Sequence, residues 1–328
     1  MPTETDPLAR FSALTREWFT GTFVKPTPAQ AQAWNAIADG DNTLVIAPTG
    51  SGKTLAAFLW AIDGLAREPA AQRGTRVLYV SPLKALAVDV ERNLRTPLTG
   101  ISRIAERTGQ QPPAISVGVR SGDTTPSKRR ELITKPPDIL ITTPESLFLM
   151  LTSAARETLS QVQTVIVDEV HAVAGTKRGA HLAVSLERLD AMLPKPAQRI
   201  GLSATVRPPE EVARFLSGAA PTTIVAPPAA KTFDLTVQVP VPDMANLENN
   251  SIWPEVEQRI VDLVEAHNSS IVFANSRRLA ERLTARLNEI HAERLGVELG
   301  GANPGVAGGA PAHLMGSGQT YGAEPLLA

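Results

Sequence analysis

Eight consecutive residues have the types and spacing that bind a phosphate chain. Residues 47–54 read Ala-Pro-Thr-Gly-Ser-Gly-Lys-Thr and lie between an apolar run and an amphipathic segment. Glycines let the backbone N–H groups approach phosphate oxygens, and the side chains supply a cation and a hydroxyl for Mg²⁺. A Gly-Ser turn before a helix is the alternative. We predict an ATP-binding loop made of Thr49, Gly50, Ser51, Gly52, Lys53 and Thr54, with Thr54 as a Mg²⁺ ligand.

Two adjacent carboxylates follow a later apolar run. Asp168 and Glu169 come directly after residues 164–167, and ligands of α/β proteins bind where parallel strands end. Asp168 is suited to hold Mg²⁺, usually through water, and Glu169 to orient or deprotonate an attacking water. A solvated turn or a helix N-cap also explains such a pair when it stands alone. The phosphate loop upstream favours the metal and catalytic roles.

An amide side chain precedes the loop. Gln30 ends the segment Lys-Pro-Thr-Pro-Ala-Gln at residues 25–30. A carboxamide can pair with the N6 and N7 edge of adenine through two hydrogen bonds. We therefore expect Gln30 to select ATP, although an exposed glutamine in the first turn of a helix has the same sequence context.

The elements that must position these residues follow an α/β pattern. Short β-rich apolar runs alternate with longer amphipathic segments, which indicates βαβ units around a buried parallel sheet. The fold class is α/β, with a parallel sheet flanked by helices. Expected strands are residues 43–47, 76–81, 115–119, 138–142, 164–168 and 199–203, and expected helices are 53–65, 85–94, 145–151 and 180–193.

Length and punctuation divide the chain into two domains. A chain of 328 residues exceeds a typical single core, and Pro227-Pro228 marks a break. We expect a first domain over 1–226, a hinge over 227–232 and a second domain over 233–328. The second is expected to hold strands 233–239 and 270–275 and helices 254–266 and 276–295, the last with an apolar stripe of Leu279, Leu283, Leu287 and Ile290.

The end of the sequence is rich in glycine. Residues 296–328 contain nine glycines and neither lysine nor arginine, which predicts a flexible segment. Two strands are too few to bury the faces of an α/β domain. We therefore expect a second domain that is incomplete in this sequence.

Composition excludes several classes of protein. The chain has no cysteine, which rules out disulfides, thiol redox chemistry and zinc sites of the cysteine type. It has neither the features of a signal peptide nor an apolar run of 18 residues, so we expect a cytoplasmic protein without a membrane partner. The net charge of -1 gives no global sign of nucleic acid, but residues 119–135 carry five basic against two acidic side chains. That local excess suits a nucleic-acid backbone, or a solvated helix face.

Six motifs in order resemble the superfamily 2 helicases of the DEAD/DEAH-box type, and within them the large helicase-related (Lhr) branch. The motifs are residues 26–30, the loop at 47–54, Ser-Pro-Leu-Lys-Ala-Leu at 81–86, Thr-Thr-Pro-Glu-Ser at 142–146, Asp-Glu-Val-His at 168–171 and Ser-Ala-Thr at 203–205. The resemblance implies a RecA-like fold, ATP hydrolysis with Mg²⁺, and movement along single-stranded nucleic acid. It favours DNA over RNA and a context of DNA repair.

The same resemblance assigns roles that the residues alone do not. It adds His171 to the catalytic residues and gives Ser203 and Thr205 the task of coupling hydrolysis to strand movement. A local hydrogen bond of His171 and a helix cap by Ser-Ala-Thr are the simpler alternatives. The residues implied to contact nucleic acid are Pro82, Lys84, Arg120, Thr142 and Thr143; of these, Thr143 before Pro144 also has the pattern of a helix N-cap where a phosphate can dock.

In the second domain, residues 272–278 resemble the first motif of the family after the hinge. We expect Phe273 in the core, Ser276 as a helix cap, and Arg277 either exposed or in contact with nucleic acid or the other domain. The later motifs, including one with an arginine finger, have no counterpart before Ala328. Because such a finger contributes about 10³- to 10⁵-fold in rate, we expect this chain alone to bind ATP but to hydrolyse it slowly.

Three functions remain open from the sequence. The first is a helicase motor that unwinds duplexes, and the second is a nucleotide-dependent clamp or remodelling module that binds nucleic acid without unwinding it. The third is an ATPase that acts on small molecules or proteins. The third leaves the motifs assigned to nucleic acid without a role.

Overall fold

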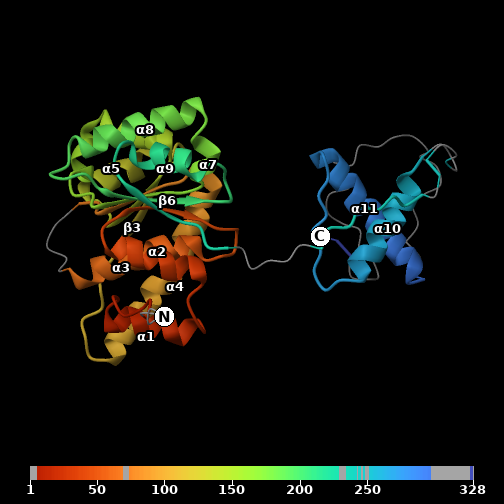
Figure 1. Cartoon of the computed structure of the whole chain (residues 1–328), viewed down its shortest axis with the longest axis horizontal. Coiled ribbons are helices and arrows are strands. Elements are labelled where there is room, and N and C mark those ends of the chain that lie inside the picture. The colour runs from red at the N-terminus through yellow and green to blue at the C-terminus, as the bar shows by residue number, and fades with distance from the viewer. Residues whose placement is uncertain are drawn as a thin grey trace. The chain divides into compact units, whose positions relative to one another are not determined.

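A computed structural model describes residues 6–68, 74–228, 234–241, 243–244, 247, 251–296 and 326–327. The chain divides into two compact units, Met1–Lys231 and Thr232–Ala328, and each is described by itself (Figure 1). In the described part of the chain, no helix is both long enough and apolar enough to cross a membrane.

The first unit is built on a parallel sheet. Its described strands are β1 (Asn42–Ile46), β2 (Val77–Val80), β3 (Val117–Arg120), β4 (Ile139–Thr142), β5 (Thr164–Val167), β6 (Gln198–Ser203) and β7 (Thr222–Val225). Their order across the sheet is β3-β4-β2-β5-β6-β1-β7, and all neighbours pair in parallel. Seven carboxyl ends therefore lie along one edge.

Helices cover both faces of this sheet (Figure 1). One face packs against α1 (Ala13–Thr22), α2 (Pro28–Ala38), α3 (Lys53–Arg67) and α4 (Lys84–Arg107). The other packs against α6 (Pro144–Leu151), the 3₁₀ helix η1 (Ala154–Leu159), α7 (Val170–Val173), α8 (Lys177–Asp190) and α9 (Pro209–Ser217). A further helix, α5 (Pro126–Thr134), lies between β3 and β4 in the sequence.

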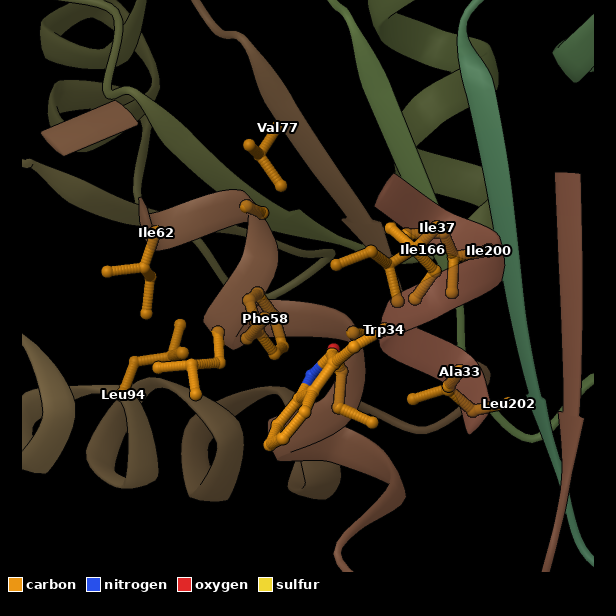
Figure 2. Packing of buried hydrophobic residues seen from close by; sticks show 14 of the residues in the cluster. Ala33, Trp34, Ile37, Phe58, Ile62, Val77, Leu94, Ile166, Ile200 and Leu202 are labelled. Carbon is orange, nitrogen blue, oxygen red and sulfur yellow. The ribbon is translucent and has the colours of Figure 1, made fainter. Parts of the chain in front are cut away.

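The core explains why the strands are apolar runs. Side chains alternate between the two faces of a strand, so Val45 packs on the α3 side while Leu44 packs on the α8 side. Figure 2 shows the α3 side, where Ile37 lies beside Ile200 and Phe58 lies near Trp34. The Trp34 indole N–H also donates to the Ala56 carbonyl at 3.0 Å, which joins α2 to α3. The N-terminus of each of these two helices lies at the sheet edge that carries the phosphate loop.

The six strands and four helices expected for the first unit are all present, with ends shifted by a few residues except in α4. That helix continues through Pro97 to Arg107, well beyond the expected end at residue 94. The edge strand β7, in which Thr223 is exposed, is not among the expected strands, because its short Thr-Thr-Ile-Val run buries only one side chain fully. The helices α1, α2, α5, α7 and α9 and the 3₁₀ helix η1 are also absent from the expected set.

The second unit contains two packed helices among its described residues, α10 (Trp253–Glu265) and α11 (Arg277–Arg294). Leu283, Leu287 and Ile290 of the expected stripe are buried against Val261, and Leu279 is partly buried there. Ser276 caps α11 as expected, because its hydroxyl accepts from the Leu279 N–H at 3.2 Å.

The prediction of two strands in the second unit is wrong for the residues that the structure describes. Residues 234–239 and 270–275 are not in strands, and Phe273 is 90% exposed rather than in the core. A strand requires a partner for its backbone groups, and the described residues of this unit offer none. Phe233 and residues 297–325, on which the glycine-rich end was expected, lie outside the described residues.

One glycine controls how α7 meets α8. A Cβ atom on Gly179 would lie 2.0 Å from the Val173 carbonyl oxygen, a backbone atom that cannot move aside alone. We expect Gly179→Ala to reduce the free energy of unfolding by about 1–3 kcal/mol through overpacking. Urea denaturation followed by tryptophan fluorescence measures the change. Gly175→Ala, in the connection between α7 and α8, is the control, since a Cβ there meets nothing within 4 Å. Equal midpoints for the two variants would contradict the assignment.

Candidate functional site

The phosphate loop presents an open helix end. Gly50 and Gly52 both have φ of 78°, a left-handed conformation that glycine adopts without the strain of a Cβ. Gly52 is the N-cap of α3, and no side chain caps this helix end. Free N–H groups and the positive end of the helix dipole therefore point out of the sheet edge, which is the arrangement that binds phosphate.

Gln30 holds the loop as well as its own helix. Its Oε1 accepts from the Thr27 N–H at 2.9 Å, and its Nε2 donates to the Gly52 carbonyl at 3.3 Å. The Thr27 hydroxyl donates to the Ser51 carbonyl at 2.8 Å. A Cβ on Gly52 would lie 2.5 Å from Gln30 Nε2, so the close approach also requires glycine. The Gln30 amide retains one lone pair and one N–H with which an adenine edge can pair.

Lys53 connects the loop to a neighbouring strand. Its ammonium group donates to the Ala47 carbonyl at 2.5 Å and to the Ser203 carbonyl, at the end of β6, at 3.0 Å. Burial lowers the pKa of Lys53, while Glu169 and then Asp168 act in the opposite direction. The charge lies inside the site, where a phosphate can replace the two carbonyl oxygens as its partner.

Asp168 is held on both oxygens. Its Oδ1 accepts from the Glu169 N–H at 2.9 Å, and the Tyr79 hydroxyl donates to its Oδ2. Tyr79 lies on β2, is fully buried, and stacks on Phe58 of α3 with ring centroids 5.0 Å apart. Burial, and next the Asp168 charge, raise the pKa of Tyr79 far above its ordinary value, so it is a donor. Tyr79 is not among the site residues expected from the sequence, because it stands in an apolar run as a core residue would.

Glu169 has an unusual backbone conformation. Its φ of 44° makes it the sole positive-φ residue other than glycine in the described part of the chain. This left-handed conformation costs a non-glycine residue about 1–2 kcal/mol and is found preferentially at functional sites. The turn places the Glu169 side chain, which is 28% exposed, beside that of His171.

His171 contacts the Ser-Ala-Thr segment. Its Nδ1 accepts from the Ala204 N–H and lies 3.3 Å from the Ser203 hydroxyl. Because a backbone N–H only donates, Nδ1 carries no proton in this arrangement, and the ring proton is on Nε2. The 3.3 Å approach of Glu169 to Nδ1 is then a contact without a hydrogen bond. Thr205, which is expected with Ser203 to couple hydrolysis to movement, is exposed.

A cavity of about 510 Å³ adjoins the loop and both acids. One part is polar, with the loop residues and the acids, and the other part is mostly apolar. Its lining outside the loop and acids comprises Trp18, Phe23, Leu55, Phe58, Leu86, Asp89, Val90, Asn93, Leu94, Thr96 and Pro97. A volume of this size and this mixture of surfaces suits a small molecule with a charged and an apolar part.

The donor atoms in the site fit magnesium. Thr54 lies in the first turn of α3 beside the loop, Asp168 faces the same cavity, and both offer oxygen, the ligand type that Mg²⁺ prefers. The described residues contain no group of three His, Cys, Asp or Glu side chains that could hold a metal by themselves. In nucleotide sites, phosphates and waters complete the coordination of Mg²⁺.

The residues expected to contact nucleic acid lie at or just after the carboxyl ends of β2, β3 and β4, which form the other half of the sheet edge. Thr142 and Thr143 are buried: the Thr142 hydroxyl donates to the Arg120 carbonyl at 2.8 Å, and Thr143 caps α6 through the Ser146 N–H. Pro82 is buried as well, and the Lys84 side chain lies outside the described atoms. The two hydroxyls therefore shape the surface from within.

Arg120 carries an uncompensated polar atom. It is half-buried at the end of β3, and burial, then Arg129, lower the pKa of its guanidinium. Its Nη1 is buried without a hydrogen-bond partner among the described residues. A buried donor without a partner is costly, so this group fits a phosphate ligand.

Arg178 ties the halves of the edge together and was missed in the sequence. It lies in the first turn of α8, shortly after the two acids, and forms a bidentate ion pair with Glu145 of α6. Its Nη1 also donates to the Pro82 carbonyl at 2.5 Å. One side chain thus fixes the segments that follow β2 and β4. No local pattern marks such a contact, because its partners are 33 and 96 residues away.

Comparison with known proteins agrees with this geometry. Residues 27–214, which contain the loop and both acids, match the family described as DEAD/DEAH box helicase. The chain belongs to this family. The RecA-like fold class and the resemblance to the Lhr branch are thereby confirmed, with the relatives below.

The chain is 81% identical over 327 residues to a protein of Mycolicibacterium smegmatis named Lhr helicase/probable uracil glycosylase. The match covers 98% of this chain and 22% of that protein. It is 54% identical to the Lhr helicase/uracil glycosylase of Escherichia coli over 87% of this chain and 20% of that one. A solved structure of the Mycobacterium smegmatis helicase Lhr bound to ssDNA and AMP-PNP is 82% identical, with a TM-score of 0.79 over 90% of this chain and 38% of that chain. The chain spans about a fifth of the length of these curated relatives.

The ion pair of Arg178 gives a pH-dependent signal. The Arg178 hydrogen bonds lower the pKa of Glu145 to about 2 from 4.5. A lowered carboxylate pKa contributes stability above pH 4.5 that is lost as the pH falls toward 2. In Arg178→Ala, we expect the Glu145 pKa to return toward 4.5, as measured by a carboxyl ¹³C NMR titration from pH 5.5 to about 3.5. Arg188→Ala on the same helix is the control, and an unchanged Glu145 titration in Arg178→Ala would contradict the pairing.

Proposed function

We propose that this chain is the ATP-binding part of a helicase motor that couples ATP hydrolysis to translocation on single-stranded nucleic acid and to duplex unwinding. One observation supports this most strongly: the loop, the two acids and the Ser-Ala-Thr segment follow three adjacent strands, β1, β5 and β6, at one edge. A nucleotide bound there touches all three. The 82% identical structure, which contains ssDNA and AMP-PNP, adds independent support.

In the proposed reaction, ATP lies with its phosphates on the N-terminus of α3. Lys53 exchanges its carbonyl partners for the outer phosphates, and Gln30 pairs with the adenine edge. Bound Mg²⁺, held by Thr54 and Asp168, would neutralise charge on the phosphates. Glu169 orients a water whose oxygen forms a bond to the γ-phosphorus as the bond to the ADP oxygen breaks, and accepts its proton.

Coupling to the strand is proposed from the contacts that His171 and Lys53 form with the end of β6. His171 accepts from the Ala204 N–H, and Lys53 reaches the Ser203 carbonyl, so changes at the phosphates are transmitted to the end of β6. Ser203 and His171 therefore form the proposed coupling group, and the family resemblance adds the exposed Thr205 to it. These contacts connect the phosphate site to the end of β6. We propose that the motor uses this connection to couple hydrolysis to movement along the strand.

Single-stranded nucleic acid is the proposed partner of the half of the edge that follows β2, β3 and β4. The exposed Lys128, the half-buried Arg120 and the N-terminus of α6 offer positive charge to a phosphate backbone. We propose DNA rather than RNA and a role in DNA repair. The ssDNA in the neighbouring structure and the glycosylase in the names of two relatives support that choice.

A clamp that binds nucleic acid without unwinding it is the second candidate, because the buried Thr142 and Thr143 hydroxyls would position a strand in either case. A protein extending over the full length of the relatives separates the two. We expect ATP-dependent release of a labelled strand from a duplex with a single-stranded tail. ATP turnover stimulated by ssDNA without strand release would favour the clamp and refute the helicase.

The phosphate assignment is tested on this chain directly. Among the described residues that line the cavity beside the loop, Lys53 is the sole one with a cationic side chain. Lys53→Ala removes this charge. Because hydrogen bonds to charged groups contribute about 1.5–3 kcal/mol, we expect ATP affinity to fall by roughly 10- to 100-fold in isothermal titration calorimetry. Lys195→Ala, an exposed lysine before β6, serves as control. Equal affinity for both variants would refute the phosphate role.

A further inference from the structure

A buried phenol in the first unit has no place in the reaction described above. Tyr79 is fully buried on β2, a strand whose other side chains are aliphatic, and its hydroxyl lies on the Asp168 carboxylate. A buried hydroxyl must form a hydrogen bond, but a phenylalanine would fill the same space without that requirement. The hydroxyl therefore calls for an explanation at Asp168 rather than in the core.

The contact fixes the orientation of the carboxylate. The Glu169 N–H donates to Oδ1 and the Tyr79 hydroxyl donates to Oδ2, so the two donors bind opposite oxygens of one planar group. A carboxylate held on one oxygen alone can rotate about the bond to its Cβ. Two donors restrict that rotation, and each oxygen keeps a free lone pair for water or metal.

The phenol ring is itself fixed by the phosphate-binding helix. Phe58 of α3 stacks on the Tyr79 ring with centroids 5.0 Å apart and an interplanar angle of 29°. Phe58 is five residues beyond Lys53 and also lines the cavity beside the loop. The carboxylate, the ring and the loop helix thus form one packed unit, in which the helix that binds phosphate determines where the carboxylate points.

We propose that Tyr79 is a positioning residue that holds Asp168 in the orientation required to bind Mg²⁺ together with ATP. The inference rests on the proposed nucleotide site. Partners that orient a metal ligand typically contribute 10- to 100-fold in metal affinity, and the low-dielectric surroundings of Tyr79 strengthen its hydrogen bond. Tyr79 itself touches neither phosphate nor metal in this arrangement.

Tyr79→Phe tests the proposal, since it removes one oxygen and retains the stacked ring. Binding of a fluorescent, non-hydrolysable ATP analogue is measured on this chain, first with EDTA and then at rising free Mg²⁺. We expect the half-saturating Mg²⁺ concentration to rise by roughly tenfold, with unchanged affinity in EDTA. An unchanged Mg²⁺ requirement in Tyr79→Phe would overturn the proposal.

A matched control separates positioning from stability. Thr158→Val deletes another buried hydroxyl, which donates to the Ala155 carbonyl at 2.7 Å within η1. We expect both variants to lower the midpoint of urea denaturation and Tyr79→Phe alone to change the Mg²⁺ requirement. The same Mg²⁺ shift in Thr158→Val would show a general loss of packing and overturn the positioning role.

A double variant tests whether the effect passes through Asp168. In an Asp168→Asn background, Tyr79→Phe should change the Mg²⁺ requirement by less than about twofold, because the oriented charge is already absent. A full tenfold effect in that background would overturn the proposal. If the unaltered chain does not bind the analogue, the proposed nucleotide site itself fails. If it binds the analogue equally with EDTA and with Mg²⁺, the nucleotide site stands, but the Mg²⁺ role of Asp168 and the positioning role of Tyr79 are overturned.

Discussion

The parallel direction of every described strand in the first unit is the constraint on which the rest depends. Parallel strands require crossover helices, so each strand ends at the same edge before its chain crosses back. Residues that are 115 positions apart, such as Lys53 and Asp168, therefore meet at one edge without any long-range motif. The site is a consequence of the sheet topology, and the side chains supply its chemistry.

The order of strands then divides this edge. The nucleotide segments follow β5, β6 and β1, and the segments proposed for nucleic acid follow β3, β4 and β2. The boundary lies between β2 and β5, where Tyr79 reaches Asp168 and where Arg178, beyond the acids, reaches Pro82. Both missed residues thus lie at the boundary, where one half of the edge can influence the other.

Much of this was predictable because the decisive signals are local. The loop glycines, the two acids and each β-rich run can be recognised from a few consecutive residues. The fold class follows from the alternation of β-rich runs with amphipathic segments. Tyr79 and Arg178 were not predictable, since their roles depend on partners 89 and 96 residues away. Phe273 shows the opposite error: its apolar run matches a strand, but strands are stable only with neighbours to pair with.

The electrostatics of the nucleotide half explain why several groups must act together. A triphosphate brings several negative charges to a cavity that already contains Asp168 and Glu169, and Lys53 opposes them with one positive charge whose pKa burial lowers. The backbone N–H groups of α3 add partial positive charge but no full one. Like charges at such distances repel strongly in a partly buried site. Binding of a triphosphate therefore demands further positive charge between the phosphates and the carboxylates, and the orientation of Asp168 decides whether that charge is well placed.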